Sequence, residues 1–295
     1  MRLLQKGLLT LMSATSNARS TRRASQATPS AAPPRGKATD DIIEGITRDV
    51  VNGVLRRGDR LPGEKELAQL FGVSQPTVRE AVRVLEAMGL VSVRHGSGVY
   101  VNGDTQQFLS RSLLTLLQLE SVGILDVLEI RRVLGRYSAG RAAEHATPED
   151  IERIEYYAER LNHLENEPDV QSIANAIVGY QVAVSAAAHN PLLFALEAFI
   201  IRLTMQFQVA AKIKRGMKFW RERTGAFDED RNKLLAAVRD GDVQGALAAW
   251  DDYLADQYEL FAGDQQLANI RLSDPKHAAT LAAVPLEISH LGPTG

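Results

Sequence analysis

The sequence contains no cysteine, which excludes disulfides, thiolate metal sites and cysteine nucleophiles, and fits a reducing compartment such as the cytoplasm. It also lacks an uninterrupted apolar run of 18 residues, so we expect no segment to span a membrane. Acidic residues are missing from residues 1–39, which carry seven lysines and arginines. Because the formal net charge of the whole chain is −2, everything after residue 39 carries −9.

The length of 295 residues allows two domains, each with its own core. Residues 1–39 are rich in Ser, Ala, Pro and Arg, and we expect a disordered basic tail. Two alternatives stay open for this segment: an arm that attracts DNA phosphates, and a start that imitates an organelle transit peptide. Residues 269–295 contain three prolines and are expected to form a flexible tail.

Residues 40–104 predict helix, short helix, tight turn, helix and hairpin in that order. Apolar residues recur at helical spacing after Asp40, and "GEKELAQLF" forms the short helix. Gly72 supplies the turn, and Ser74 is a good N-cap for the third helix. "LVSVRHGSGVYVNG" alternates around a glycine-rich centre, as a hairpin does. This order is that of a winged helix-turn-helix.

The third helix of this unit would begin by exposing Gln75, Thr77 and Arg79, which suits the major groove of DNA. The alternative is a plain three-helix bundle with solvated polar positions. Residues 40–104 hold eight Lys/Arg against ten Asp/Glu, so a DNA-binding surface here must gather its cations locally. The basic tail or dimerisation would supply the remaining affinity.

Residues 105–268 predict helices throughout, so the second domain is expected to be all-α and the whole chain mainly α. Boundaries rest on turn and capping residues such as those at 147–148, 190–191 and 241–242. The expected helices are 106–119, 123–145, 148–165, 169–188, 191–214, 226–240 and 243–265.

The stretch "GDRLPGEKELAQLFGVSQPTVREAVRVLEAMGLVSVRHGSGVYV" resembles the DNA-binding domain of GntR-type transcription factors, over roughly residues 40–103. The helical remainder resembles the FCD effector domain of the FadR subgroup through three stretches. These are "VLEIRRVL" (127–134), "AAAHNPLL" (186–193) and "LLAAVRDGDVQGALAAWDDYL" (234–254). The resemblance implies a bacterial, nucleoid-associated regulator that binds a pseudo-palindromic double-stranded operator as a homodimer.

In this family, DNA contacts come from the second helix, the recognition helix and the wing tip. By resemblance, the DNA-binding residues here are Lys65, Ser74, Gln75, Thr77, Arg79, His95 and Gly96. Gln75 stands where arginine is common, and since Gln favours adenine whereas Arg favours guanine, the operator is expected to differ from the family norm. Gly63 replaces a usual Ser cap, at a small cost in stability.

Many FCD domains hold a divalent metal with one Asp and three His. The matching positions here are Ile177, Gln181, Arg231 and Tyr253, and a slip of one residue would put Asp230 in place of Arg231. Isoleucine cannot ligate a metal, and arginine does not lose its proton. We therefore expect no metal and no other cofactor.

The same positions, together with an arginine in "EIRR" that often faces the FCD pocket, predict a metal-free effector site instead. Its residues are Arg131, Gln181, Arg231 and Tyr253. A buried guanidinium needs a partner, and a carboxylate provides one bidentately, so the expected effector is a small organic acid or, more narrowly, an acyl-CoA. The alternative is an internal pair of Arg131 with Glu129 or Asp252 and a pocket that binds nothing.

The chain shows no nucleophile–base arrangement, phosphate loop or metal cluster, so we do not expect an enzyme. The sequence favours an effector-responsive transcriptional regulator, in the form of a repressor of a metabolic operon. The alternative is a DNA-binding protein whose C-terminal domain only dimerises and binds no ligand.

Overall fold

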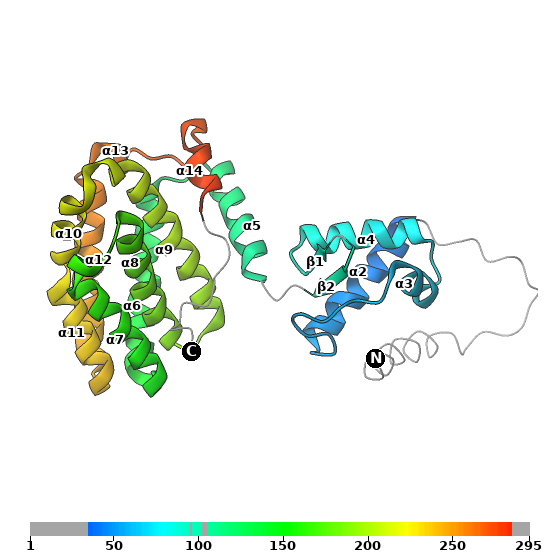
Figure 1. The fold of residues 1–295 in the computed structure, drawn as a ribbon, viewed down its shortest axis with the longest axis horizontal. Helices are drawn as coiled ribbons and strands as arrows, with labels where there is room; N and C mark the ends of the chain where they lie inside the picture. Colours follow the sequence, from blue (N-terminus) through cyan, green and yellow to red (C-terminus); the bar gives the residue numbers. More distant parts are fainter. Residues whose placement is uncertain (1–34, 95, 102–104, 285–295) are drawn as a thin grey trace, which may run out of the picture. The chain divides into compact units, whose positions relative to one another are not determined.

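Residues 35–94, 96–101 and 105–284 are described by a computed structural model (Figure 1). The chain divides into two compact units, residues 1–108 and 109–295. The first unit is a winged helix-turn-helix and the second is an all-α bundle, which confirms the predicted fold class.

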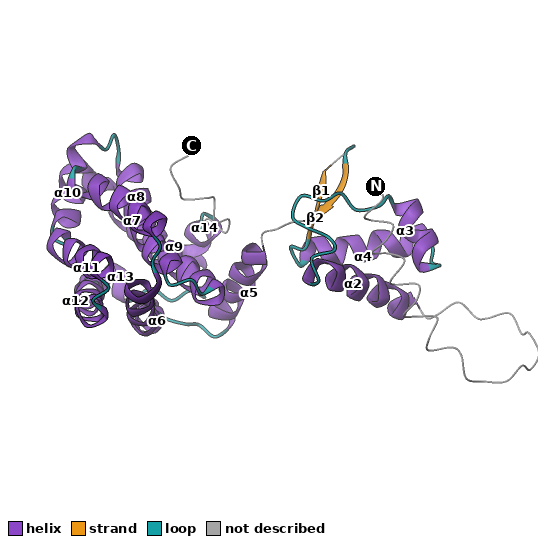
Figure 2. Cartoon of the chain, turned by 90° about the horizontal axis from the view of Figure 1, so that it is seen from below, coloured by secondary structure: helices purple, strands orange, loops and turns teal. Residues whose placement is uncertain are grey.

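Between residues 35 and 101, the described part of the first unit has three helices and a two-stranded wing, whose strands stand out in Figure 2. Helix α4 packs against α2 and α3 and also contacts the first strand. The strands pair antiparallel, from Val91 opposite Val101 to Arg94 opposite Gly98. The elements are α2 (Arg35–Val51), α3 (Glu64–Phe71), α4 (Gln75–Ala87), β1 (Val91–Arg94) and β2 (Gly98–Val101).

Two residues set the tight turn between α3 and α4. Gly72 has φ of 64°, a left-handed conformation that glycine adopts without steric cost. Ser74 is extended, and its hydroxyl accepts a hydrogen bond from the Thr77 N–H at 3.4 Å. The apolar side of α4, formed by Val78, Ala81, Val82 and Leu85, is buried in the core of this unit.

Helix α2 begins before the predicted boundary at Asp40. It starts at Arg35, and Ala38 and Thr39 are already buried. Ala38 continues the apolar spacing of Ile42 and Ile46 backward by four residues, so the helix gains buried contacts by starting earlier. The expected tail of residues 1–39 is therefore wrong for 35–39, and residues 1–34 lie outside the described part of the chain.

The second unit packs its long helices side by side (Figure 1). Helix α6 contacts α8, α9 and α12, while α8 also contacts α7 and α9. The elements are α5 (Thr105–Leu119), α6 (Ile124–His145), α7 (Pro148–Asn162), η1 (Leu164–Asn166), α8 (Val170–Ala187), α9 (Pro191–Lys212), η2 (Ile213–Arg215), α10 (Gly216–Gly225), α11 (Asp228–Asp240), α12 (Val243–Ala262), α13 (Gln265–Ala268), η3 (Pro275–His277) and α14 (Ala278–Ala282).

The sequence assigned no element to residues 215–225, but the structure has helix α10 there. Gly216, with φ of 76°, separates this helix from the turn that follows α9. The buried indole of Trp220 donates to the Lys212 carbonyl at 3.2 Å, which fastens α10 against the end of α9. This packing, rather than local helical spacing, places α10.

The flexible tail expected from residue 269 onward is wrong for residues 269–284. Ile270, Leu272 and Leu281 are buried in a core cluster of the bundle. The Ile124 N–H donates to the Ile270 carbonyl at 3.1 Å, and the Leu272 N–H donates to the Val122 carbonyl at 3.0 Å. These backbone bonds hold the segment against the start of α6. Residues 285–295 lie outside the described part of the chain.

The segment Pro191–Gly225 is long and apolar enough to cross a membrane by length and composition. However, 78% of its most apolar window is buried inside the bundle. Helix α9 also carries the buried charged residues Glu197 and Arg202. The segment is a core element of the second unit, since its apolar surface is covered by neighbouring helices.

Candidate functional site

The first candidate site is the exposed surface at the start of α4. Gln75 is exposed, and the Thr77 hydroxyl lies 2.9 Å from the Ser74 hydroxyl, where either oxygen can donate. Ser74 thus both caps the helix and keeps a hydroxyl at its tip. A helix N-terminus with exposed polar side chains can approach phosphates and base edges.

Arg79 is one turn further along α4 and also faces outward. Its guanidinium Nε donates to Glu64 Oε2 on α3 at 2.7 Å, and the two side chains are 58% and 41% exposed. Lys65, beside Glu64, is exposed. The predicted residues of α3 and α4 therefore lie on accessible surface, with Glu64 as an acidic neighbour that the sequence analysis did not single out.

The wing carries two arginines that the sequence analysis also left out. The Arg94 guanidinium lies over the Tyr100 ring, 4.5 Å from its centre. Arg60 forms an isolated β-bridge with Tyr100, and its side chain runs beside Gly98. Gly96 is exposed with φ of 75°, as a slim wing tip needs, whereas His95 lies outside the described residues.

Residues 40–104 contain more acidic than basic residues, so the positions of the exposed cations matter for DNA binding. Arg60 and Arg94 both border Tyr100 in the wing, and Lys65 and Arg79 are exposed on α3 and α4. Exposed cations at these two places can contact phosphates although residues 40–104 as a whole carry no positive net charge.

The second candidate site is inside the bundle. Side chains of three helices form one hydrogen-bonded network there. Arg131 of α6 donates from Nη1 to Gln257 Oε1 at 2.5 Å and from Nη2 to Gln181 Oε1 at 2.8 Å. The Gln181 amide nitrogen of α8 then donates to the Tyr253 hydroxyl of α12 at 2.7 Å. All four side chains are buried.

The fourth predicted residue, Arg231 of α11, has other partners. Its Nη1 donates to the Thr224 carbonyl at 3.0 Å, and its Nη2 pairs with Asp228. Among the described residues its Nε–H has no hydrogen-bond partner, and neither has the Thr224 hydroxyl, although both atoms are buried. A buried donor without a partner is costly and indicates a place for a water or a ligand.

A small cavity of about 20 Å³, which we call the inner cavity, lies beside these groups. Tyr253 and Arg231 line it together, whereas Gln181 and Arg131 do not line it and instead bond to the lining residues Tyr253 and Gln257. The structure thus brings two of the four predicted residues to one cavity. The other two form hydrogen bonds to residues that line it. The full lining is Ile177, Met205, Gln208, Arg223, Thr224, Phe227, Arg231, Tyr253, Gln257 and Leu260.

The internal pair of Arg131 with Glu129 or Asp252, considered from the sequence, is wrong, because both acids are exposed and Arg131 bonds to amides. Burial lowers the pKa of Arg131, opposed by Tyr253 and the carboxylate of Glu197. Glu197 accepts hydrogen bonds from Ser138 and, at 2.7 Å, from Ser185. Burial raises the pKa of Glu197 despite these bonds.

Isoleucine and arginine stand at two of the four positions that the resemblance matched to metal ligands, and neither side chain is a usual metal ligand. Ile177, Arg231 and Tyr253 line the inner cavity, and Asp230, the residue reached by a one-residue slip, does not. Within the described ranges, no group of three or more His, Cys, Asp or Glu side chains could hold a metal ion.

The sequence matches two families along its length. Residues 38–101 match the bacterial regulatory proteins of the gntR family, and residues 126–256 match the FCD domain.

Relatives over most of the chain are transcriptional regulators. The HTH-type transcriptional regulator Mce2R of Mycobacterium tuberculosis (strain CDC 1551 / Oshkosh) is 31% identical, covering 75% of this chain and 90% of that protein. The HTH-type transcriptional regulator LutR of Bacillus subtilis (strain 168) is 28% identical, covering 72% and 96%. The Uxu operon regulator of Haemophilus influenzae is 32% identical, covering 52% and 55%.

The fold agrees with a solved structure of Streptococcus agalactiae GntR, at a TM-score of 0.58 and 19% identity, covering 75% of this chain and 99% of that one. Winged helix, all-α bundle, family matches and relatives all lead to one assignment. The chain belongs to the GntR family of transcriptional regulators, with an FCD domain following its DNA-binding domain, and it is a regulator and not an enzyme.

Proposed function

We propose that this regulator is a cytoplasmic, nucleoid-associated repressor of a metabolic operon that senses a small carboxylate without a metal. As a homodimer it binds a pseudo-palindromic operator through the exposed surfaces of α3, α4 and the wing. Binding of the effector in the bundle changes operator affinity by linkage, and the change can be no larger than the effector's differential affinity for the two states.

One observation carries the effector proposal. The Arg231 guanidinium is 1% exposed, and its Nε–H and the nearby Thr224 hydroxyl lack partners among the described residues. Both residues line the inner cavity with Tyr253. A carboxylate oxygen placed there would accept from the guanidinium and from a hydroxyl at once. Arg231, whose Nη2 also pairs with Asp228, would supply the positive charge that attracts the carboxylate.

The size of the inner cavity sets a condition on this binding. A volume of about 20 Å³ holds about one water and no carboxylate. The surrounding side chains must therefore move when the effector binds, and this movement is what couples the cavity to the rest of the bundle. The same small volume favours the second candidate function, a C-terminal domain that only dimerises.

Isothermal titration calorimetry of the full chain with monocarboxylates of two to four carbons tests the proposal. We expect binding to the unchanged protein, at least about tenfold weaker binding to Arg231→Gln, and operator affinity that changes with the ligand. Arg239→Gln is the matched control, because Arg239 is on the same helix but exposed and paired with Glu155. The two variants should have the same helical circular dichroism.

Two results would overturn the metal-free site: stoichiometric zinc or nickel in the purified protein, or carboxylate binding that survives Arg231→Gln. Operator affinity unchanged by any carboxylate or acyl-CoA, in a protein that is still dimeric, would favour the purely dimerising domain.

A stripe on α6 supports the homodimer. Ile130, Val133 and Tyr137 share one face of the helix and are 57%, 68% and 56% exposed. Clustered exposed apolar side chains are typical of a protein interface. Val133→Asp should dissociate the dimer in sedimentation-velocity ultracentrifugation. The control Val51→Asp alters an exposed valine of the first unit and should leave the dimer intact. A Val133→Asp dimer as stable as the unchanged protein would exclude this face.

A further inference from the structure

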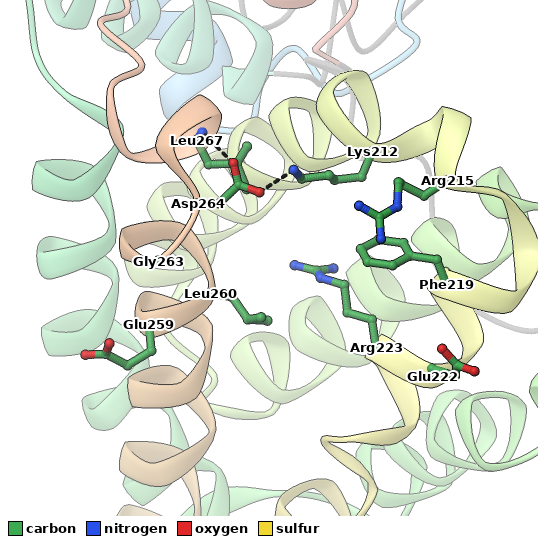
Figure 3. A pocket seen from close by; sticks show the side chains of 10 residues that line it. All are labelled: Lys212, Arg215, Phe219, Glu222, Arg223, Glu259, Leu260, Gly263, Asp264 and Leu267. Atoms are coloured by element: carbon green, nitrogen blue, oxygen red, sulfur yellow. Dashed lines mark hydrogen bonds and ion pairs between the residues drawn. The ribbon is translucent and has the colours of Figure 1, made fainter.

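A second, much larger pocket lies next to the inner cavity, where the end of α9, helix α10 and the end of α12 meet (Figure 3). This outer pocket has a volume of about 570 Å³. Small-molecule sites usually measure about 300–1,000 Å³, so this pocket is large enough for a whole metabolite. Its lining is Lys212, Arg215, Phe219, Glu222, Arg223, Glu259, Leu260, Gly263, Asp264 and Leu267.

The two pockets are neighbours, because Arg223 and Leu260 line both of them. Arg223 extends toward the centre of the outer pocket in Figure 3, between Phe219 and Leu260. Its Nη2 donates to the amide oxygen of Gln208, which is buried and also lines the inner cavity. Arg223 thus stands at the boundary between the two spaces.

The acidic residues of the outer pocket either form ion pairs with lysines or point away from the pocket's other side chains. Asp264 pairs with Lys212, as the dashed line in Figure 3 shows, and Glu222 pairs with Lys218 at 3.8 Å. Glu259 is exposed, and its carboxylate points away from the other labelled side chains (Figure 3).

The two arginines, by contrast, have no carboxylate partner within the described parts of the chain. Arg215 lies over the Phe219 ring, 4.7 Å from its centre, and Arg223 lies 5.3 Å from the Trp220 ring centre and bonds only to the neutral amide. Two guanidiniums beside an aromatic ring and a leucine fit an organic anion with an apolar body.

We propose that the outer pocket and the inner cavity form one site for an elongated dicarboxylate. One carboxylate occupies the inner cavity at Arg231 and Thr224, as the proposed function requires, and this inference rests on it. The apolar body passes Leu260, and Arg223 leaves Gln208 to let it through. The second carboxylate remains in the outer pocket and pairs with Arg215. The outer pocket then holds the rest of the molecule, while the side chains around the inner cavity move to admit the first carboxylate.

The test compares dicarboxylates of four to seven carbons with monocarboxylates of the same length, by calorimetry on the full chain. We expect the best dicarboxylate to bind about tenfold or more tightly than its matched monocarboxylate, since a charge-assisted bond is gained. Arg215→Gln should remove this preference and leave monocarboxylate affinity unchanged. Arg215 is exposed, so the substitution should not disturb folding.

Lys214→Gln is the matched control, because Lys214 is the exposed neighbour of Arg215 and does not line the outer pocket. It should keep the preference for the dicarboxylate. Equal affinity of the two acids, or a preference that survives Arg215→Gln, would overturn the two-ended site. In that case, monocarboxylate binding that depends on Arg231 would still support the proposed function. Dicarboxylate binding that is insensitive to Arg231→Gln would overturn both.

Discussion

The Arg79 guanidinium of α4 and the Glu64 carboxylate of α3 form an ion pair at 2.7 Å on the surface that we assign to DNA. The pair joins the two helices of the helix-turn-helix. Because both side chains are about half exposed, solvent screens the pair and it adds little stability. If the proposed surface binds DNA, Glu64 would have to share the Arg79 guanidinium with a base or a phosphate.

Replacing Arg79 tests this surface. Arg79→Ala should weaken specific operator binding by about 1–3 kcal/mol per half-site, because a contact to a base or a phosphate is lost. The thermal unfolding temperature should hardly change, since the lost pair is exposed. Band-shift titration at fixed salt is the measurement. Arg83→Ala, one turn further along the same helix and also exposed, is the control. A folded Arg79→Ala protein with unchanged operator affinity would show that this face does not bind DNA.

Gln75 is exposed at the first position of α4, where a side chain can reach a base edge. Its amide offers both donor and acceptor groups, which matches adenine, whereas arginine offers only donors and matches guanine. Gln75→Arg should therefore shift the preferred base toward guanine at one symmetric position in each half-site. Selection of binding sites from random DNA with both proteins measures this. Identical preferences would mean that residue 75 reads no base.

Most helices could be predicted from sequence because their ends carry local signals. Helix boundaries were expected at Thr147, Asn190 and Asp242. The side chains of these residues cap α7, α9 and α12, respectively. A capping residue acts within three residues of itself, so its effect is visible in the sequence alone.

Features that depend on distant contacts could not be predicted this way. Glu64 meets Arg79 across fifteen positions, and Ile270 is ordered by a backbone bond to Ile124. Likewise, the four predicted effector residues were grouped by resemblance, but packing left only Tyr253 and Arg231 at the inner cavity. Arg223 carries no sequence signal at all, because its importance comes from lying between two pockets.

Gly179 lies on α8 against Tyr157 of α7. A Cβ added to this glycine would lie 2.2 Å from the Tyr157 ring, which is itself buried. Gly179→Ala should therefore lower the free energy of unfolding by about 1–3 kcal/mol, since the ring must move in a packed core. Urea denaturation followed by circular dichroism measures the loss. Gly225→Ala is the control, because its added Cβ would make only an ordinary contact of 3.6 Å. Equal stability of the two variants would contradict this account.

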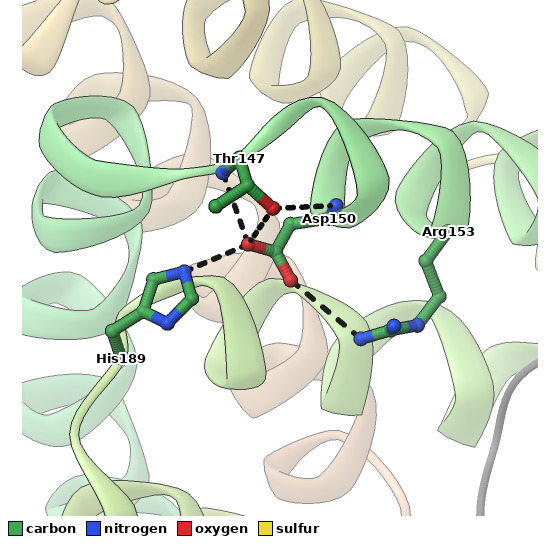
Figure 4. Close-up of polar contacts among 4 residues, drawn as sticks. All are labelled: Thr147, Asp150, Arg153 and His189. Carbon is green, nitrogen blue, oxygen red and sulfur yellow. Dashed lines mark hydrogen bonds and ion pairs between the residues drawn. The ribbon is translucent and has the colours of Figure 1, made fainter.

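The last prediction concerns Asp150, which joins the start of α7 to the end of α8 (Figure 4). Its carboxylate accepts hydrogen bonds from the Thr147 N–H at 3.0 Å and the Thr147 hydroxyl at 2.7 Å. The ring Nε2 of His189 lies 2.7 Å from the same oxygen, and His189 has an unusual φ of 49°. Burial by itself would raise the pKa of Asp150, but the bonds from Thr147 and His189 outweigh it and lower the pKa.

A carboxyl group whose pKa is lower in the folded state stabilises the protein above its unfolded pKa, and this stabilisation is lost as the pH falls through the folded pKa. Asp150→Asn should therefore cost about 1 kcal/mol near pH 7, because it removes the charge from these bonds. The difference in unfolding free energy between the two proteins should shrink as the pH falls below about 4. Urea titrations at a series of pH values measure it. A difference that stays constant down to about pH 3 would show that the ionised carboxylate is not what joins α7 to α8.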